Sequence, residues 1–137
     1  MTLATQGPEG PWAAAVFYAN DGSDIYFLSA SSTRHARNLA SDPRVAATVQ
    51  EDYSDWKQIR GVQMEGQASW LSIPDSVKAA TQFAAKFAFA DPRRAEITIA
   101  AALARITWYK LRPSAMYFVD NSRGFGWRER FDPTAPG

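Results

Sequence analysis

The order of strand-like and helix-like segments is the feature that most constrains the fold of this chain. Residues 2–72 hold short runs of small, β-branched and aromatic residues, separated by turn-forming residues and by one short helix-like segment. Apolar residues recur at three- and four-residue spacing between 74 and 105, and two strand-like runs, ITWYKL and AMYFVD, follow. Strands first, helices late and a final hairpin predict an antiparallel barrel or sandwich rather than an alternating parallel sheet.

Turn-forming and helix-capping residues show where the individual segments begin and end. Asn20, Asp21 and Gly22 predict a hairpin turn between AAAVFYA and DIYFLS, and TLATQG before them supplies another strand. Thr33 is the expected N-cap of a helix over RHARNLA that ends at Asp42 and Pro43. The runs RVAATVQ and IRGVQMEGQASWLS predict two more strands. Asp91 and Pro92 divide a helical insert at about 74–105 into two helices, inside a single domain that spans residues 1–137.

Composition excludes several classes of protein. The 137 residues contain no cysteine, which rules out disulfides, thiolate metal sites and a cysteine nucleophile. The net charge of +1 argues against a nucleic-acid partner, although Arg123, Arg128 and Arg130 make the C-terminal region basic. No apolar run is as long as a membrane span, and MTLATQGPEG lacks the features of a signal peptide. We therefore expect a cytoplasmic protein without a membrane partner.

The segment SASSTRHARN at 29–38 is the strongest candidate site. Hydroxyl groups, the Arg34 cation and the amides of a helix start converge there after a strand, and such a place suits an anion. The alternative interpretation is an ordinary N-cap followed by a solvated helix face. His35 is the only histidine, so no histidine-rich metal centre can form, and we expect it to be solvated or to assist Arg34 at a phosphate.

Other candidate motifs have simpler explanations. The acidic residues Glu51, Asp52 and Asp55 lack the spacing of a calcium loop, and no metal site is expected. The GFG at 124–126 lacks the third glycine and the βαβ setting of a dinucleotide fingerprint. Six aromatic residues offer planar surfaces to a flavin ring, although most aromatics fill cores or interfaces: Trp56, Trp108, Tyr117, Phe118, Phe125 and Trp127.

Taken together, the segments resemble the pyridoxamine 5'-phosphate oxidase-like FMN-binding split-barrel superfamily over nearly the whole chain. The resemblance rests on three stretches of sequence: GPWAAAVFYANDGSDIYFLSASSTRHARNLASDPRVAATV, the tryptophan before IRGVQMEG, and YKLRPSAMYFVDNSRGFGWRERF. IRGVQ, TRHA and DNSRGFG look especially like a branch of small, uncharacterised bacterial proteins in that superfamily. The resemblance implies an α+β, mostly β fold: a six-stranded antiparallel Greek-key split barrel with short appended helices. It also implies a homodimer that binds two FMN molecules between its subunits.

The resemblance also assigns cofactor-binding residues by position. The strand along the flavin ring corresponds to residues 14–18, with the backbone of Val16 and Phe17 as ring contacts, and Leu28 and Ser29 end the next contacting strand. The family's Ser/Thr-Arg-Lys phosphate clamp falls on Thr33, Arg34 and His35. The complete set of expected cofactor contacts is Val16, Phe17, Tyr18, Leu28, Ser29, Ser32, Thr33, Arg34, His35, Asn38, Gln63 and Arg130.

Several positions depart from the family pattern. His35 stands where lysine is usual, and a neutral imidazole offers one donor where an ammonium offers three. The family's central-strand glutamine falls on Gly61, so Gln63, two residues on and on the same sheet face, is its expected substitute. Asp120 stands at a tryptophan position, and Arg128 replaces a substrate-binding histidine. Oxidation of pyridoxamine 5'-phosphate itself is therefore not expected.

Three functions remain open from the sequence. The first is an FMN-dependent oxidoreductase or flavin reductase with a small-molecule substrate that is not assigned. The second is a non-catalytic flavin-binding or flavin-sensing module, since no acid–base pair is readable near the expected ring. The third keeps the barrel but binds another cofactor, such as a deazaflavin or haem, because a fold does not fix its ligand.

Overall fold

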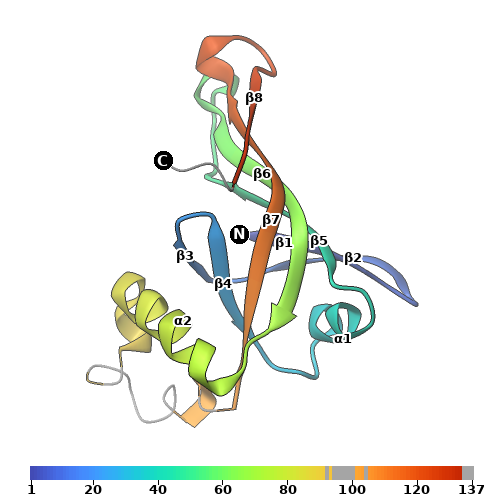
Figure 1. The fold of residues 1–137 in the computed structure, drawn as a ribbon. Coiled ribbons are helices and arrows are strands. Elements are labelled where there is room, and N and C mark those ends of the chain that lie inside the picture. Colours follow the sequence, from blue (N-terminus) through green and yellow to red (C-terminus); the bar gives the residue numbers. More distant parts are fainter. Residues whose placement is uncertain (92, 94–100, 104, 134–137) are drawn as a thin grey trace.

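The computed structural model describes all residues except 92, 94–100, 104 and 134–137. Within them, eight strands form one sheet whose path is β2-β1-β5-β6-β7-β4-β3, with β8 paired to β7 and every pairing antiparallel (Figure 1). The strands are β1 (Thr2–Gly7), β2 (Gly10–Ala15), β3 (Tyr18–Asp21), β4 (Asp24–Ser29), β5 (Arg44–Gln50), β6 (Arg60–Trp70), β7 (Thr107–Asp120) and β8 (Arg128–Phe131).

The two ends of the sheet path are joined covalently. Its terminal strands, β2 and β3, are consecutive in the chain and are connected by Val16 and Phe17. At this seam the Val16 N–H donates to the Met1 carbonyl oxygen at 2.9 Å, and the chain then leaves β1 to pair with β4. The expectation of one strand over AAAVFYA is therefore wrong, because its two halves pair with different neighbours. The sheet curls back on itself as a split barrel.

The last expected hairpin is instead one strand. Most of ITWYKL and all of AMYFVD belong to β7, which pairs with β6 from Tyr109 to Asp120. The register shifts between Glu65 and Gly66, so that Glu65 faces Ala115 while Gly66 faces Pro113. Proline lacks the N–H that a regular ladder requires, and a bulge is where a strand tolerates it. The turn-forming residues at 112–114 thus mark a bulge rather than a chain reversal.

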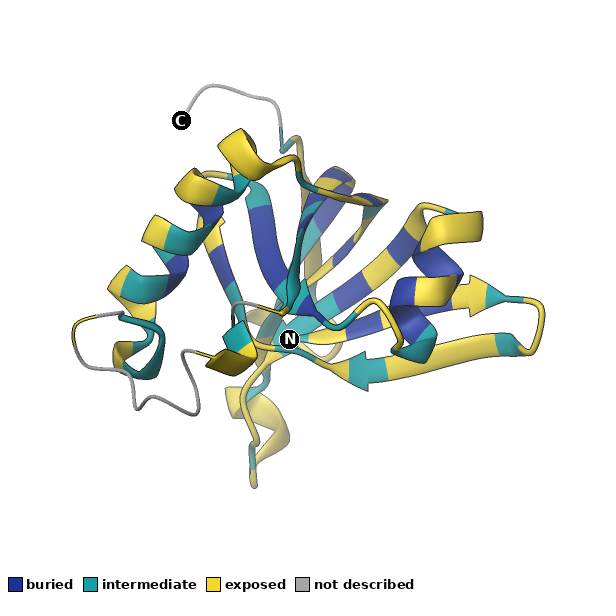
Figure 2. Ribbon diagram, turned by 90° about the horizontal axis from the view of Figure 1, so that it is seen from below, coloured by how far each residue is buried: buried dark blue, intermediate teal, exposed yellow. Residues whose placement is uncertain are grey.

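Helices cover the barrel on two sides. Helix α1 (Arg34–Ser41) begins at the predicted N-cap Thr33, and its Ala36 and Leu39 join the core beside Leu3. Helix α2 (Ile73–Lys86) buries Ala79 and Phe83 completely. In Figure 2 the buried residues gather on the inner faces of the strands and on the helix sides that face them. Short 3-10 helices lie at η1 (Trp56–Gln58), η2 (Ala88–Ala90) and η3 (Asn121–Arg123).

The predicted fold class is confirmed, with a different strand count. Breaking the second strand at the seam and adding β8 gives eight strands instead of six. The hairpin turn has Gly22 at a φ of +56°, as the sequence predicted. The second helix expected in the insert lies mostly outside the described residues. Among those that are described, no helix has the length and apolar character needed to cross a membrane.

Candidate functional site

The sequence-predicted site between β4 and α1 contains a compact polar cluster. The hydroxyl of Ser29, at the end of β4, lies 2.8 Å from Thr33 Oγ1 and 2.7 Å from His35 Nε2. Thr33 Oγ1 also donates to the Ala30 carbonyl at 3.0 Å and accepts the Ala36 N–H at 3.3 Å, so it caps the helix. The cluster therefore fixes the first turn of α1 against the end of β4.

His35 is not the solvated side chain that the sequence suggested. It is 8% exposed, and its ring is held by the hydroxyls of Ser29 and Thr33. Burial lowers its pKa below the ordinary value of 6.5, because the charged imidazolium is less well solvated there. At neutral pH the ring is uncharged. His35 thus positions the hydroxyls of the site and contributes no positive charge to it.

Arg34 is the cation of the site, and it reaches away from the cluster to the β1–β2 hairpin. Its guanidinium lies 4.6 Å from the centre of the Trp12 ring, and Nη2 donates to the Glu9 carbonyl at 2.9 Å. Its ion pair with the exposed Glu9 carboxylate is loose, at 3.8 Å. Its Nε is buried and has no hydrogen-bond partner among the described residues. The side chain is therefore held in place by stacking and retains an unused donor.

Trp12 and Glu9 were not among the predicted site residues. They lie on a different hairpin, far from Arg34 in the sequence, and no local motif links them to it. Trp12 is 41% exposed, which is common for a hairpin aromatic and gives no functional signal by itself. Only the packing of α1 against β1 and β2 brings the three residues together.

The expected ring contacts lie at the barrel seam. Phe17 is 61% exposed, and its ring packs edge-on against Phe87 and Phe89. Tyr18 begins β3, and Lys86 Nζ lies 3.6 Å from the centre of its ring. Leu28, on β4, pairs with Trp108 of β7. The seam therefore joins the end of α2 to the strands that the family resemblance assigns to the flavin.

The other expected contacts do not all gather at α1. Ser32 is exposed, and its carbonyl accepts from Arg37, whereas Asn38 is buried and donates to Thr5 Oγ1 at 3.0 Å. Gln63 and Arg130 instead lie in one row across β6, β7 and β8, on either side of Tyr117. In the described part of the chain, no hydrogen bond or ion pair links this row to the cluster around Ser29, Thr33 and His35.

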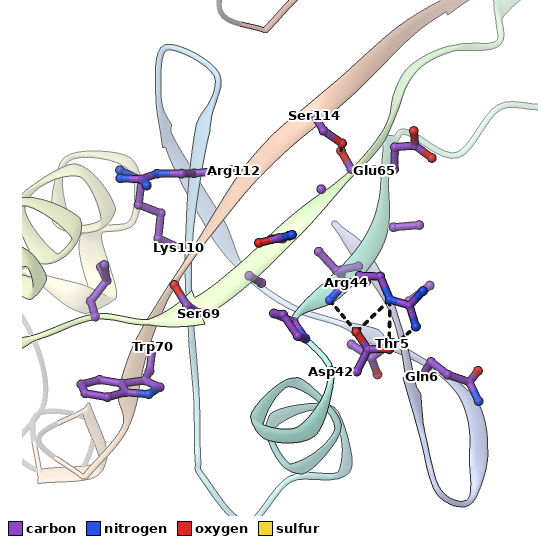
Figure 3. A pocket seen from close by; sticks show the side chains of 18 of the residues that line it. Thr5, Gln6, Asp42, Arg44, Glu65, Ser69, Trp70, Lys110, Arg112 and Ser114 are labelled. Atoms are coloured by element: carbon purple, nitrogen blue, oxygen red, sulfur yellow. Dashed lines mark hydrogen bonds and ion pairs between the residues drawn. The ribbon is translucent and has the colours of Figure 1, made fainter.

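A large groove occupies the outer face of the sheet, between the end of α1 and the start of α2 (Figure 3). Its volume is about 1050 Å³, and its floor comes from β1, β5, β6 and β7. Arg44 and Asp42 form a bidentate ion pair on one side, which lowers the pKa of Asp42 to about 2. Lys110 and Arg112 lie on the other side, near the exposed Trp70. None of the twelve predicted residues lines this groove.

Comparison with known proteins places the chain in a family. The family model described as pyridoxamine 5'-phosphate oxidase matches residues 1–120. The chain belongs to this family. It is also 32% identical over 117 residues to a UPF0306 protein of Enterobacter sp. (strain 638), a match that covers 84% of this chain and 75% of that protein. Membership of a branch of small bacterial proteins is thereby confirmed.

Solved structures confirm the fold. A heme binding protein from Mycobacterium smegmatis superposes with a TM-score of 0.74 at 24% identity, over 96% of this chain and 52% of the other. The chain thus spans about half the length of that protein. HutZ, the heme storage protein from Vibrio cholerae, superposes with a TM-score of 0.65 at 22% identity, over 82% of this chain and 79% of HutZ. At these identities the likeness concerns the fold alone.

Proposed function

We propose that this family member binds FMN, with the flavin phosphate at the N-terminus of α1. The proposal rests on the state of Arg34, whose guanidinium is stacked on Trp12 beside a helix start and whose buried Nε has no partner in the described part of the chain. Helix N-termini favour anions through the dipole and through amides that have no partner within the helix. A phosphate would replace the loose, exposed contact between Arg34 and the Glu9 carboxylate.

The polar cluster supports the same ligand by fixing the helix start. Ser29 and Thr33 are held there by their bonds to each other and to His35, and Thr33 Oγ1 donates to the Ala30 carbonyl. These bonds use the hydroxyl protons within the cluster, so its role in the proposed site is to hold the first turn of α1, whose backbone amides would bind the anion. His35 is neutral, so Arg34 carries the positive charge of the proposed site. The charge that the family's usual lysine would add is absent from this position.

Haem is the alternative, because two solved proteins with this fold are a heme binding protein and a heme storage protein. The chain has a single histidine and no cysteine, so the ligands to haem iron are few. His35 Nε2 already lies 2.7 Å from Ser29 Oγ, inside the protein. Ligation of iron by His35 would require that bond to break and the start of α1 to open. The local geometry therefore supports a flavin phosphate better than a His35-ligated haem.

We further propose that the protein is a homodimer with flavin at the subunit interface. The outer face of the sheet presents the small, exposed residues Ala4, Ala13 and Ala46 on neighbouring strands, which permits another chain to approach closely. The expected ring contacts at the seam are open on one side, as the exposed Phe17 shows. Light scattering tests this proposal, and a monomer with bound FMN would contradict it.

The bound flavin would supply electron or hydride transfer, and the protein would supply its binding and orientation. We propose an FMN-dependent oxidoreductase or flavin reductase, with a non-catalytic flavin-binding or sensing module as the second candidate. Stopped-flow reduction by NADH and NADPH separates the two. Rapid reduction followed by turnover with an acceptor supports the enzyme, whereas tight FMN binding without turnover supports the module.

The absorption spectrum of the protein purified without added cofactor distinguishes flavin, deazaflavin and haem. FMN affinity is then measured by fluorescence quenching in the native protein, Arg34→Ala and Arg93→Ala. Arg93 is the control, because it is an exposed arginine outside α1 that forms an ion pair with Asp91. We expect Arg34→Ala to bind FMN about 10-fold to 100-fold more weakly and Arg93→Ala to bind within about twofold of the native protein. A haem spectrum, or no uptake of FMN, would overturn the proposal.

A further inference from the structure

The two ends of the barrel differ in how they are closed. At one end, α1 inserts Ala36 and Leu39 into the core. At the other end, the inward-facing side chains Tyr18, Val49 and Val62 are only partly buried, although they pack against the same core. The apolar interior of the sheet is thus exposed at this mouth.

A cavity of about 940 Å³ lies at the mouth. Tyr18, Val49, Val62 and Phe118 give it an apolar wall, because these side chains continue the inner face of β3, β5, β6 and β7 beyond the packed core. The mouths of β-barrels are common ligand sites, and this volume is within the range for small molecules. The outer groove of Figure 3 is a different surface, since the two cavities share no lining residue.

The rim of the cavity is polar and carries positive charge. Lys57 and Arg60 line it together with Tyr53, whose hydroxyl donates to the Arg60 carbonyl at 3.1 Å. Arg60 is fixed by Asp120, with Nε 3.2 Å from Oδ1. Lys57 has no acidic partner in the described residues, and Glu51 is the only carboxylate that lines the cavity. Lys86 adds another cation nearby, above the ring of Tyr18.

We propose that this barrel mouth binds a small planar aromatic anion, with the ring against Tyr18, Val62 and Phe118 and the anionic group toward Lys57. The aromatic walls of the cavity suit a flat ring, and the unpaired cation at its rim selects the sign of the charge. The site is separate from the phosphate site at α1, but it adjoins the seam at Val16 and Phe17 and shares Tyr18 with the expected flavin-ring contacts. Lys57 is not among those expected contacts, so a charge reversal at Lys57 distinguishes the two sites.

The test uses naphthalene-2-sulfonate, a planar aromatic sulfonate, titrated into the full chain by calorimetry because a bound flavin would interfere with a fluorescence measurement. Val62→Trp fills the mouth and is expected to weaken binding at least about 10-fold. Lys57→Glu reverses an exposed charge without touching the core, so it tests the site even where Val62→Trp disturbs folding. We expect about 10-fold weaker binding for Lys57→Glu at low salt, with a smaller effect at high salt.

Two control variants outside the barrel mouth show whether the probe binds elsewhere on the protein. Trp70→Ser removes the exposed aromatic of the outer groove, and Lys78→Glu reverses an exposed lysine on α2. Both are expected to bind the probe within about twofold of the native protein. Three results would overturn the proposal: no saturable binding, native affinity in Lys57→Glu, or loss of binding in Trp70→Ser.

Discussion

The position of α1, and with it the proposed phosphate site, depends on a contact between Asn38 and Gly7. Asn38 is 4% exposed and donates to Thr5 Oγ1 on β1. A methyl group built at Gly7 would overlap Asn38 Oδ1 and lie 2.5 Å from its Cγ. Gly7 does not have a positive φ, so alanine there meets no backbone strain. The effect of Gly7→Ala therefore measures how closely α1 packs on β1.

The magnitudes follow from this geometry. Gly7→Ala is expected to cost about 2 kcal/mol of unfolding free energy, since overfilling a packed site costs about 1–3 kcal/mol. Asn38→Ala is expected to cost about 2 kcal/mol, because it loses one buried hydrogen bond and leaves a small cavity. In the double variant the amide that the new methyl would strike is gone. The combined loss should therefore be smaller than the sum by about 1–2 kcal/mol.

The native protein, the two single variants and the double variant form a double-mutant cycle. Their unfolding free energies are measured by urea unfolding followed by circular dichroism. A second cycle that pairs Gly7→Ala with Asn20→Ala is the control, because Asn20 is an exposed residue of the β3–β4 hairpin. That control cycle is expected to be additive. A neutral Gly7→Ala, or an additive cycle for Gly7 and Asn38, would refute this placement of α1.

Three further predictions concern individual residues. Thr33→Ala removes the N-cap of α1 and is expected to cost about 1 kcal/mol in urea unfolding, with a further loss of FMN affinity; an unchanged unfolding midpoint would contradict the cap. Gly66→Ala places a methyl group against the Arg112 carbonyl and 2.8 Å from Pro113 Cα, so the free energy of unfolding measured by thermal unfolding should fall by about 1–3 kcal/mol. An unchanged free energy of unfolding would contradict the close approach at the bulge. Because the pKa of His35 is lowered in the folded state, stability is expected to fall as pH decreases below 6.5, and His35→Gln should reduce this slope; identical pH profiles would contradict a buried neutral His35.

Local patterns predicted the parts of the fold that depend on neighbouring residues. Thr33 caps α1, Asp42 and Pro43 follow its end, and Gly22 turns the hairpin, because each of these acts through its own backbone or that of the next few residues. The fold class followed from the order of the segments and from the family resemblance.

Long-range packing decided what local patterns could not predict. The strand over AAAVFYA breaks at Val16 and Phe17 because barrel closure gives its halves different partners. Pro113 lies in a bulge because Gly66 lets β6 approach it closely. His35 is buried because α1 turns this side of the helix toward Ser29, and Arg34 meets Trp12 through the packing of α1 on β2. None of these contacts has a signature within a short stretch of sequence.

The central claim is that Arg34 and the start of α1 bind the phosphate of FMN. It is tested most directly by comparing the dissociation constants of FMN and riboflavin, which differ only in that phosphate, in the native protein and in Arg34→Ala. We predict that the native protein prefers FMN by about 10-fold to 100-fold, as charge-assisted hydrogen bonds allow, and that Arg34→Ala binds both ligands with nearly the same affinity. Equal affinities in the native protein, or an unchanged preference in Arg34→Ala, would contradict the claim.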